Sequence, residues 1–174
     1  MWKYDREEEY NKNKENMLKQ LFIIDMNKYD KKIVDKQKKL IDEYRKENNQ
    51  INFVLNSNYE LIDDYKKEIG KPNTRIYYKN NRNGMYNRTL QDEIKYYKNL
   101  KEIVIAGIDI YDFSIGLSNY LDEIGRHVDI FISRDTTNMK ESFHYLNCLL
   151  DDRGIKVVEK LEYLKDIEKI YKLR

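Results

Sequence analysis

Short apolar runs alternate with longer amphipathic segments along most of this chain, and this alternation constrains the fold more than any other feature. The apolar runs, read as strands, lie at residues 21–25, 51–56, 74–78, 103–106, 128–133 and 155–158. The segments between them carry apolar residues at helical spacing and predict helices at 30–47, 61–69, 88–99, 113–124, 138–152 and 160–172. Strands joined by helical crossovers pair in parallel. We therefore predict an α/β fold, a doubly wound, mostly parallel six-stranded sheet with helices on both faces.

Turn residues support these boundaries. Gly125 and Gly154 follow two of the predicted helices and fit the C-terminal cap position. Asn138 with Glu141 three residues later has the form of a capping box at the start of the helix that follows the fifth strand. The stretch 70–73, Gly-Lys-Pro-Asn, stops the short helix before the third strand.

Length and charge limit the classes of partner. The chain has 174 residues, which fits one domain, and its net charge is only +2. Such a balance gives no electrostatic case for binding nucleic acid or a membrane surface. No apolar stretch approaches the ~20 residues of a membrane span, and the polar N-terminus is unlike a secretory signal. With Cys148 as the single cysteine, we expect a cytoplasmic protein without disulfides.

The N-terminal residues differ from the rest. We divide the chain into a charged extension, residues 1–17, and a single α/β domain, residues 18–174. The extension is either a frayed surface segment or an arm that docks on a neighbouring subunit through Trp2. The chain has one proline, sixteen tyrosines and a single alanine, Ala106, a bias that suggests an AT-rich genome such as that of a virus, a phage or a low-GC bacterium. A viral protein of this kind would act in the host cytoplasm.

Two strands end in residues that carry chemistry. Asp25 ends the first apolar run, and Lys79 directly follows the third. The carboxyl ends of parallel strands meet at one edge of a sheet, so we expect these two side chains to lie together. They are either part of a ligand site or a buried ion pair that serves the fold alone.

Several stretches in order resemble one known family. They are Leu21–Asn27 (LFIIDMN), Lys79 with Thr89-Leu90, Ile103–Asp109 (IVIAGID), Arg134-Asp135 and Arg153–Val157 (RGIKV). Together they span about residues 20 to 165 and resemble the isochorismatase-like cysteine hydrolases, the superfamily that includes nicotinamidases. The resemblance implies a Rossmann-like three-layer sandwich.

The resemblance also implies roles for three positions. In the family an Asp is the general base, a Lys stabilises charge, and a Cys at the start of the helix after the fourth strand attacks the substrate. A helix N-terminus lowers a thiol's pKa, and its N–H groups can hold an oxyanion. The first two positions match Asp25 and Lys79, but a gapless count from Gly107 places Phe113 at the Cys position. A phenyl ring cannot attack, so the resemblance implies inherited geometry without the reaction.

Other nucleophiles fit poorly. Asp112 and Ser114 flank the position, but neighbouring helix residues point about 100° apart, so Ser114 is expected to face away from Asp25. Cys148 stands among leucines and reads as a small buried hydrophobic residue.

No metal or other cofactor is expected. Nicotinamidase-type members place an Asp and two His beside the pocket. This chain has only His127, before the fifth strand, and His144, inside a helix, whereas Asn56-Ser57-Asn58 follows the second strand. Both histidines are read as surface or core residues.

These points favour a catalytically inactive protein that binds a small molecule or a protein partner, including a host protein, through a vestigial pocket. The predicted pocket residues are Asp25, Asn56, Lys79, Met85, Asp109, Tyr111, Asp112 and Phe113. By resemblance we expect a homo-oligomer, a dimer or tetramer formed through the face near the pocket. Two alternatives stay open: an active hydrolase of amide, ester or vinyl-ether bonds that uses a water activated by Asp25, and a purely structural oligomer subunit.

Overall fold

The computed structural model describes residues 17–79, 87–138 and 143–165, without the side chains of 143–147. Its elements, in chain order, are β1 (Lys19–Ile24), α2 (Lys31–Lys46), β2 (Gln50–Asn56), α3 (Asp63–Lys66), β3 (Thr74–Lys79), α4 (Arg88–Tyr96), β4 (Glu102–Ile108), α5 (Tyr111–Glu123), β5 (Asp129–Asn138), α6 (Phe143–Asp152) and β6 (Ile155–Val158).

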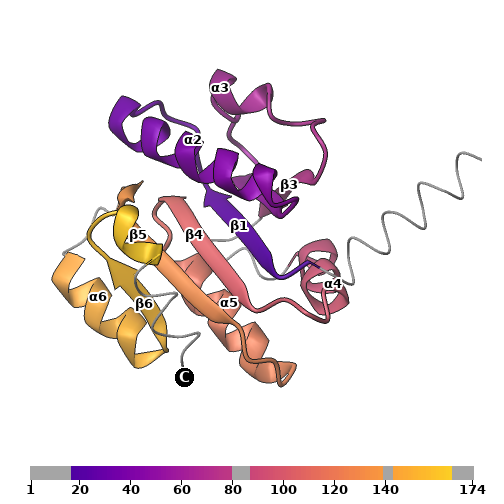
Figure 1. Cartoon of the computed structure of the whole chain (residues 1–174), viewed down its shortest axis with the longest axis vertical. Coiled ribbons are helices and arrows are strands. Elements are labelled where there is room, and N and C mark those ends of the chain that lie inside the picture. The colour runs from indigo at the N-terminus through magenta and orange to yellow at the C-terminus, as the bar shows by residue number, and fades with distance from the viewer. Residues whose placement is uncertain (1–16, 80–86, 139–142, 166–174) are drawn as a thin grey trace, which may run out of the picture.

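The six strands form one parallel sheet in the order β3-β2-β1-β4-β5-β6 (Figure 1). The chain builds outward from β1 to the edge strand β3, then returns to β4 and builds outward to β6. This confirms the predicted doubly wound sheet. The order in which the chain adds strands reverses between β1 and β4. In sheets of this kind, ligands bind at this point, outside the carboxyl ends of the strands.

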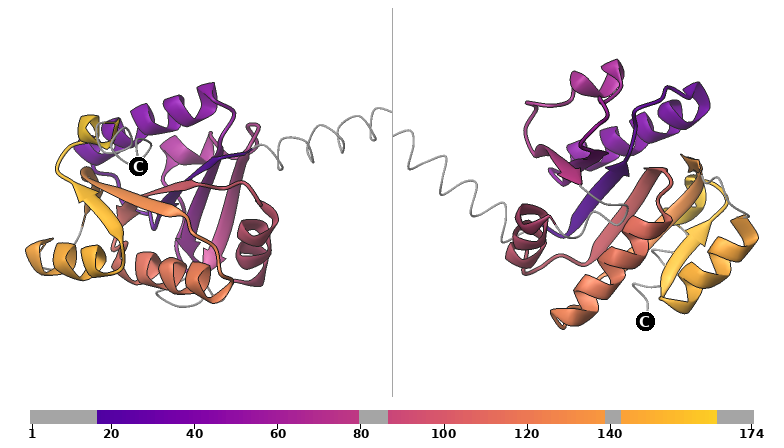
Figure 2. Two further views of the ribbon diagram at one scale, coloured as in Figure 1. Left: turned by 60° about the horizontal axis from the view of Figure 1, so that its bottom comes forward. Right: turned by 180° about the vertical axis from the view of Figure 1, so that it is seen from behind.

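Helices cover both faces of the sheet, which confirms the predicted three layers (Figures 1 and 2). Alternate residues of β1 explain the layering, because successive strand side chains point to opposite faces. Phe22 and Ile24 join the buried cluster formed with α4, α5 and α6. Leu21 and Ile23 join a second buried cluster formed with α2 and α3. The central strands are therefore apolar on both sides, as expected for a buried parallel strand.

Helix α2 illustrates how sequence fixes an element. Asp30 caps its N-terminus by accepting hydrogen bonds from the N–H groups of Lys32 and Ile33 at 3.2 and 3.4 Å. Arg45 and Lys46 occupy the last turn, where positive charge complements the helix dipole. The buried side chains match the predicted stripe: Ile33, Val34, Gln37, Leu40, Ile41 and Tyr44.

Gly107 sets the close approach of β4 to β1. Its φ is +123°, and a Cβ there would lie 2.1 Å from the carbonyl oxygen of Ile24. Only glycine fits such a position. The pairing of β4 with β5 changes register between Ile105 and Gly107, just before the chain turns into α5.

Strand β5 is longer than predicted and runs to Asn138. Asp135 therefore lies inside the strand, and both of its carboxylate oxygens accept from the N–H of Leu161, at 3.0 and 3.1 Å. Asn138 ends the strand, and its carbonyl accepts from the N–H of Asp109 at 3.0 Å. The capping role predicted for Asn138 with Glu141 is untested, because Glu141 lies outside the described residues.

Some predictions fall on parts of the chain that the structure does not describe. These are the N-terminal extension as far as residue 16, with Trp2, the pocket residue Met85, and the helix beyond residue 165. Met17, assigned to the extension, is buried in the core. None of the described helices has the length and apolar character needed to span a bilayer.

Candidate functional site

Asp25 stands where β1 ends, at the carboxyl edge of the sheet. Its φ is +52°, a left-handed conformation that aspartate adopts more readily than most residues. The Asp25 N–H donates to the Val54 carbonyl at 2.7 Å, and Oδ1 accepts from the N–H of Asn56 at 3.0 Å. The end of β2 therefore holds both the backbone and the carboxylate of Asp25.

Lys79 reaches this carboxylate from the edge strand β3. Its Nζ lies 2.6 Å from Asp25 Oδ2, and the side chains of Lys79 and Asp25 are 3% and 14% exposed. The Lys79 carbonyl also accepts from the N–H of Ser57 at 3.2 Å. The sequence therefore predicted correctly that the two side chains meet. Burial makes the pair expensive to break, because either charge left alone has little water to solvate it.

Phe113 occupies the first turn of α5 and is fully buried. Its ring packs on that of Phe22 with centroids 5.5 Å apart and planes tilted by 41°. It belongs to the same buried cluster as Ile24, Leu117 and Val54. The position where the resemblance places a nucleophile therefore belongs to the hydrophobic core.

The alternative nucleophiles have other surroundings. Ser114 is buried, and its Oγ donates to the carbonyl of Ile110 at 2.8 Å. The hydroxyl proton of Ser114 is therefore used in a hydrogen bond to the backbone of its own helix. Asp112 is half-buried in the first turn of α5. Cys148 is exposed on α6, so the prediction of a small buried residue was wrong. It lies two residues from the buried Leu150, on the opposite side of the helix.

The predicted rim residues belong to several connections. Asn56 contributes its backbone N–H to Asp25 and keeps a partly exposed side chain. Asp109 is exposed with a φ of +48°, and Tyr111 is half-buried at the start of α5. The structure brings Asp25, Asn56 and Lys79 into direct contact.

The described histidine side chain lies away from Asp25, Asn56 and Lys79. His127 is 94% exposed and lies 3.3 Å from Asp129 at the start of β5. The side chain of His144 lies outside the described residues. Among the side chains that are described, no cluster of three or more His, Cys, Asp or Glu residues could hold a metal ion.

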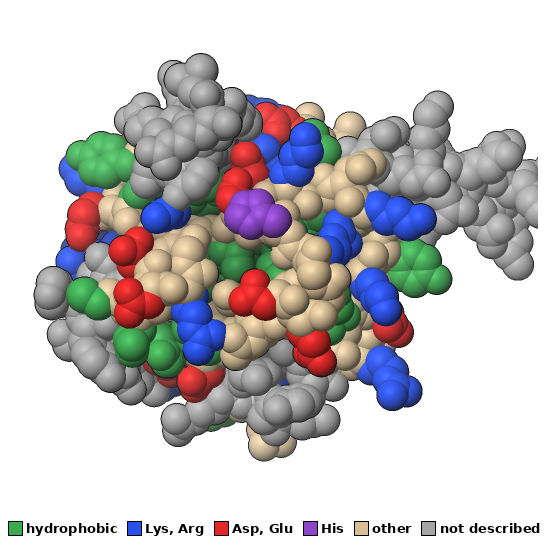
Figure 3. Space-filling view, turned by 90° about the horizontal axis from the view of Figure 1, so that it is seen from below, with side chains coloured by type: hydrophobic (Ala, Val, Ile, Leu, Met, Phe, Trp, Pro, Cys, Tyr) green, Lys and Arg blue, Asp and Glu red, His purple; other side chains and the backbone are tan. Residues whose placement is uncertain are grey.

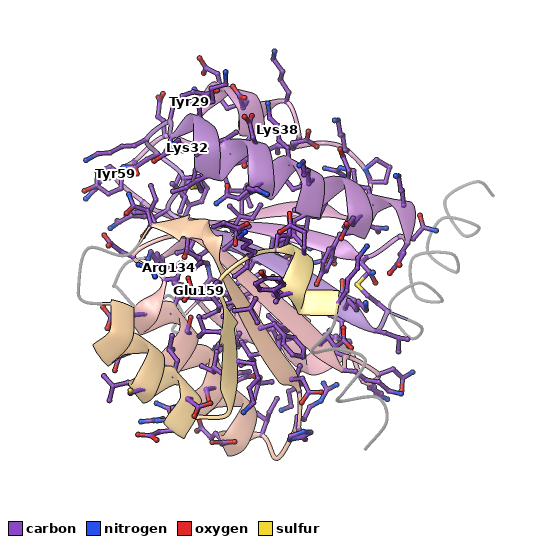
Figure 4. All side chains as sticks on the ribbon, turned by 60° about the vertical axis from the view of Figure 1, so that its left-hand side comes forward. Tyr29, Lys32, Lys38, Tyr59, Arg134 and Glu159 are labelled. Atoms are coloured by element: carbon purple, nitrogen blue, oxygen red, sulfur yellow. The ribbon has the colours of Figure 1, made fainter. Side chains whose placement is uncertain are left out.

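Sequence reasoning missed two exposed aromatic residues at the same edge. Tyr29 follows β1 and is 59% exposed, and Tyr59 follows β2 and is 51% exposed. Figure 4 shows both on the side of the molecule where Arg134 and Glu159 also lie, and the last two form an ion pair at 3.3 Å. An aromatic residue in a polar loop directly after a buried strand was the available signal.

Two grooves lie away from Asp25. One, of about 780 Å³, separates the C-terminal half of α2 from residues 161–165 and includes Lys19 at the start of β1. The other, of about 600 Å³, follows the outer side of β3. Neither is lined by Asp25, Lys79 or Phe113. On the face in Figure 3, described basic and acidic side chains are interspersed, so this face offers no uniform charge to a polyanion.

Comparison with solved structures settles the fold. A nicotinamidase from Staphylococcus aureus superposes with a TM-score of 0.68 at 16% sequence identity, covering 82% of this chain and 98% of that one. The fold is that of the isochorismatase-like hydrolases. An isochorismatase-like hydrolase from Alkaliphilus metalliredigens gives a TM-score of 0.62 at 13% identity, covering 86% and 98% of the two chains.

A third solved structure with a similar fold is the YcaC gene product of Escherichia coli, described as an octameric hydrolase of unknown specificity. Its TM-score is 0.62 at 15% identity, and the match covers 83% of this chain and 76% of that one. No family model matches the sequence, and no curated protein does. At these identities the likeness establishes the fold and leaves the reaction open.

Proposed function

We propose that this protein is a catalytically silent relative of the isochorismatase-like hydrolases that binds a small molecule or a protein partner at the carboxyl edge of its sheet. The observation that carries the proposal is the burial of Phe113. A fully buried phenyl ring stands in the first turn of α5, where the resemblance calls for a thiol. No proton or electron pair for attack is available from it.

The proposed contact surface surrounds Asp25 and Lys79. Only a small part of the Asp25 carboxylate is exposed, so a ligand would meet the pair at its rim. The exposed rings of Tyr29 and Tyr59 favour a protein partner on the loops of the same edge, because tyrosine is enriched in protein interfaces. The rest of the proposed rim consists of Asn56, Asp109, Tyr111 and Asp112, and Met85 is assigned to it from the sequence alone.

An active hydrolase remains the second candidate, and Asp25 is the residue that favours it. Its carboxylate accepts from Asn56 through Oδ1 and from Lys79 through Oδ2, yet each carboxylate oxygen retains a further lone pair. A water on that lone pair could be activated without any thiol. The third candidate is a structural subunit in which the pocket residues only pack.

The experiment is a substrate panel with the purified full-length protein: nicotinamide, isochorismate and simple amides. We expect no turnover above background, and the same result for Asp25→Asn. Asp30→Asn is the matched control, because Asp30 is an acidic residue at the start of α2 that caps a helix. Turnover that Asp25→Asn abolishes and Asp30→Asn preserves would establish the hydrolase instead.

Ligand binding separates a silent binding protein from a structural subunit. Under our proposal, a pool of metabolites or a host extract contains a component that raises the melting temperature of the protein. If that component is a protein, the double variant Tyr29→Ala with Tyr59→Ala should show a smaller increase in melting temperature. Both side chains are exposed, so these variants are expected to fold. No response from any pool would favour the structural subunit. A homo-oligomer formed in the cytoplasm is part of the proposal, and the octameric YcaC supports it.

A further inference from the structure

Strand β3 forms one edge of the sheet, and its backbone alternates between two directions. The N–H of Ile51 donates to Asn73 at 2.8 Å, and the N–H of Ser57 donates to Lys79 at 3.2 Å. Odd-numbered residues of this strand therefore direct their backbone groups toward β2. In a parallel ladder the intervening residues point away, so Thr74, Ile76 and Tyr78 direct their N–H and C=O groups outward.

The outer edge is largely unprotected within the described part of the chain. The Tyr78 carbonyl accepts from Asn87 Nδ2 at 2.9 Å, and no other outward backbone group of β3 has a described partner. Proteins commonly protect edge strands with charged side chains. Here Lys79 is buried against Asp25, and Arg75, which also lines the groove along the strand, is paired with Glu93 at 2.9 Å.

Apolar side chains are accessible along this edge. Tyr78 is 50% exposed, Ile69 is 36% exposed, and Ile76 is partly buried against the cluster beneath α3. They line the groove of about 600 Å³ beside the strand, together with Thr74, Asn87 and Thr89. β-Branched and aromatic residues of this kind suit strand pairing. The edge thus has both the hydrogen-bonding groups and the side chains of a pairing strand.

We propose that this edge pairs with β3 of a second copy of the chain, antiparallel about a two-fold axis at Ile76. In that register Ile76 faces Ile76, Thr74 faces Tyr78, and Arg75 faces Tyr77. Each outward N–H then meets an outward C=O, and the two six-stranded sheets become continuous. The Tyr78 C=O, which already accepts from Asn87 Nδ2, uses its second lone pair in this pairing. The proposal is independent of any ligand at Asp25.

The strand selects its own copy because its pattern is self-complementary. Each Thr74 packs against a Tyr78, a favourable β-branched and aromatic pair, on both sides of the axis. Arg75 is placed opposite Tyr77, so no like charges oppose each other in the paired stretch. Two-fold pairing also closes the interface after two copies, whereas a parallel addition would not close.

Disulfide trapping tests the register directly. In a Cys148→Ser background, we would oxidise Thr74→Cys protein, Tyr78→Cys protein and their mixture. Residues opposite each other in such a pair have Cα atoms about 5.5 Å apart, within the range of a disulfide. The mixture should give a cross-linked 74–78 dimer in much higher yield than either protein alone. Tyr96→Cys, on exposed α4, is the control that should not cross-link.

Analytical ultracentrifugation measures the association itself. Tyr78→Lys and Ile76→Pro should each raise the dimer dissociation constant by about tenfold or more. The Ile76 N–H faces outward, so proline there removes no bond to β2. Circular dichroism verifies that the variants fold. If Ile76→Pro does not fold, Tyr78→Lys alone tests the association. A wild-type monomer at all concentrations would overturn the proposal, as would a dimer indifferent to Tyr78→Lys or equal cross-linking of all three samples.

Discussion

The rings of Phe22 and Phe113 pack 5.5 Å apart and join the middle of β1 to the first turn of α5. This contact fixes the start of the helix against the central strand with two large apolar side chains. In the resemblance the same turn presents a reactive group to a pocket. Here the turn places a buried ring in the core and contributes to the free energy of folding.

Phe113→Ala should lower the free energy of unfolding by about 3–5 kcal/mol, because it removes a fully buried ring and leaves a cavity. Phe113→Leu keeps most of the volume and should lose less. Phe113→Cys should resemble the Ala variant in stability and should gain no amidase activity. Urea unfolding measures the first two effects. A Phe113→Ala protein as stable as the wild type would show that the ring does not support the core.

The ion pair between Asp25 and Lys79 should be strongly coupled. Lys79→Met alone leaves a carboxylate that is 14% exposed, and breaking a buried pair in this way costs roughly 3–5 kcal/mol. Adding Asp25→Asn removes that charge, so the double variant should lose about 1–3 kcal/mol less than the sum of the single ones. A double-mutant cycle in urea provides the coupling energy.

An exposed pair provides the comparison. Asp63 and Lys66 lie 3.4 Å apart with side chains 91% and 49% exposed, so their coupling energy should be far smaller than that of the buried pair. Equal coupling in the two cycles would mean that burial does not strengthen the inner pair.

Local pattern was enough to predict six strands in a doubly wound, parallel sheet, because each buried strand reads as a continuous apolar run. The meeting of Asp25 and Lys79 followed from the topology, since parallel strands end at one edge. The extent of β5 was missed because Asp135 is held by Leu161, a contact 26 residues away in the sequence. The exposure of Cys148 was missed because the neighbouring leucines suggest a buried stretch. The helical period instead places Cys148 on the side opposite the buried Leu150.

Gly107 and Gly125 should respond very differently to alanine. Both have positive φ, +123° and +69°, but a Cβ at Gly107 would lie 2.1 Å from the Ile24 carbonyl, whereas nothing lies within 4 Å at Gly125. Gly125→Ala should cost about 1–2 kcal/mol, the strain of a left-handed residue. Gly107→Ala must also displace β4 from β1 and should prevent stable folding. Expression in soluble form and thermal unfolding distinguish the two, and similar melting temperatures would refute the close approach.

Tyr65 makes stability depend on alkaline pH. It is fully buried, and its OH donates to Gln37 Oε1 at 2.6 Å. Burial is the main reason that the pKa of Tyr65 is raised, and the nearby carboxylate of Asp64 adds to it. The folded state therefore holds the phenolic proton more tightly than the unfolded chain. The resulting stability is complete below the unfolded pKa of about 10 and is lost as the pH rises above it.

The difference in the free energy of unfolding between the wild type and Tyr65→Phe should therefore become smaller as the pH rises. Near pH 8 the variant should be less stable by about 1–2 kcal/mol, because Gln37 loses its donor. Above pH 10 the wild type should lose up to about 1.4 kcal/mol per pH unit through Tyr65, a slope that the variant lacks. Urea unfolding from about pH 8 to about pH 11 measures both curves. If the curves of Tyr65→Phe and the wild type run parallel, Tyr65 ionises equally in the folded and unfolded states.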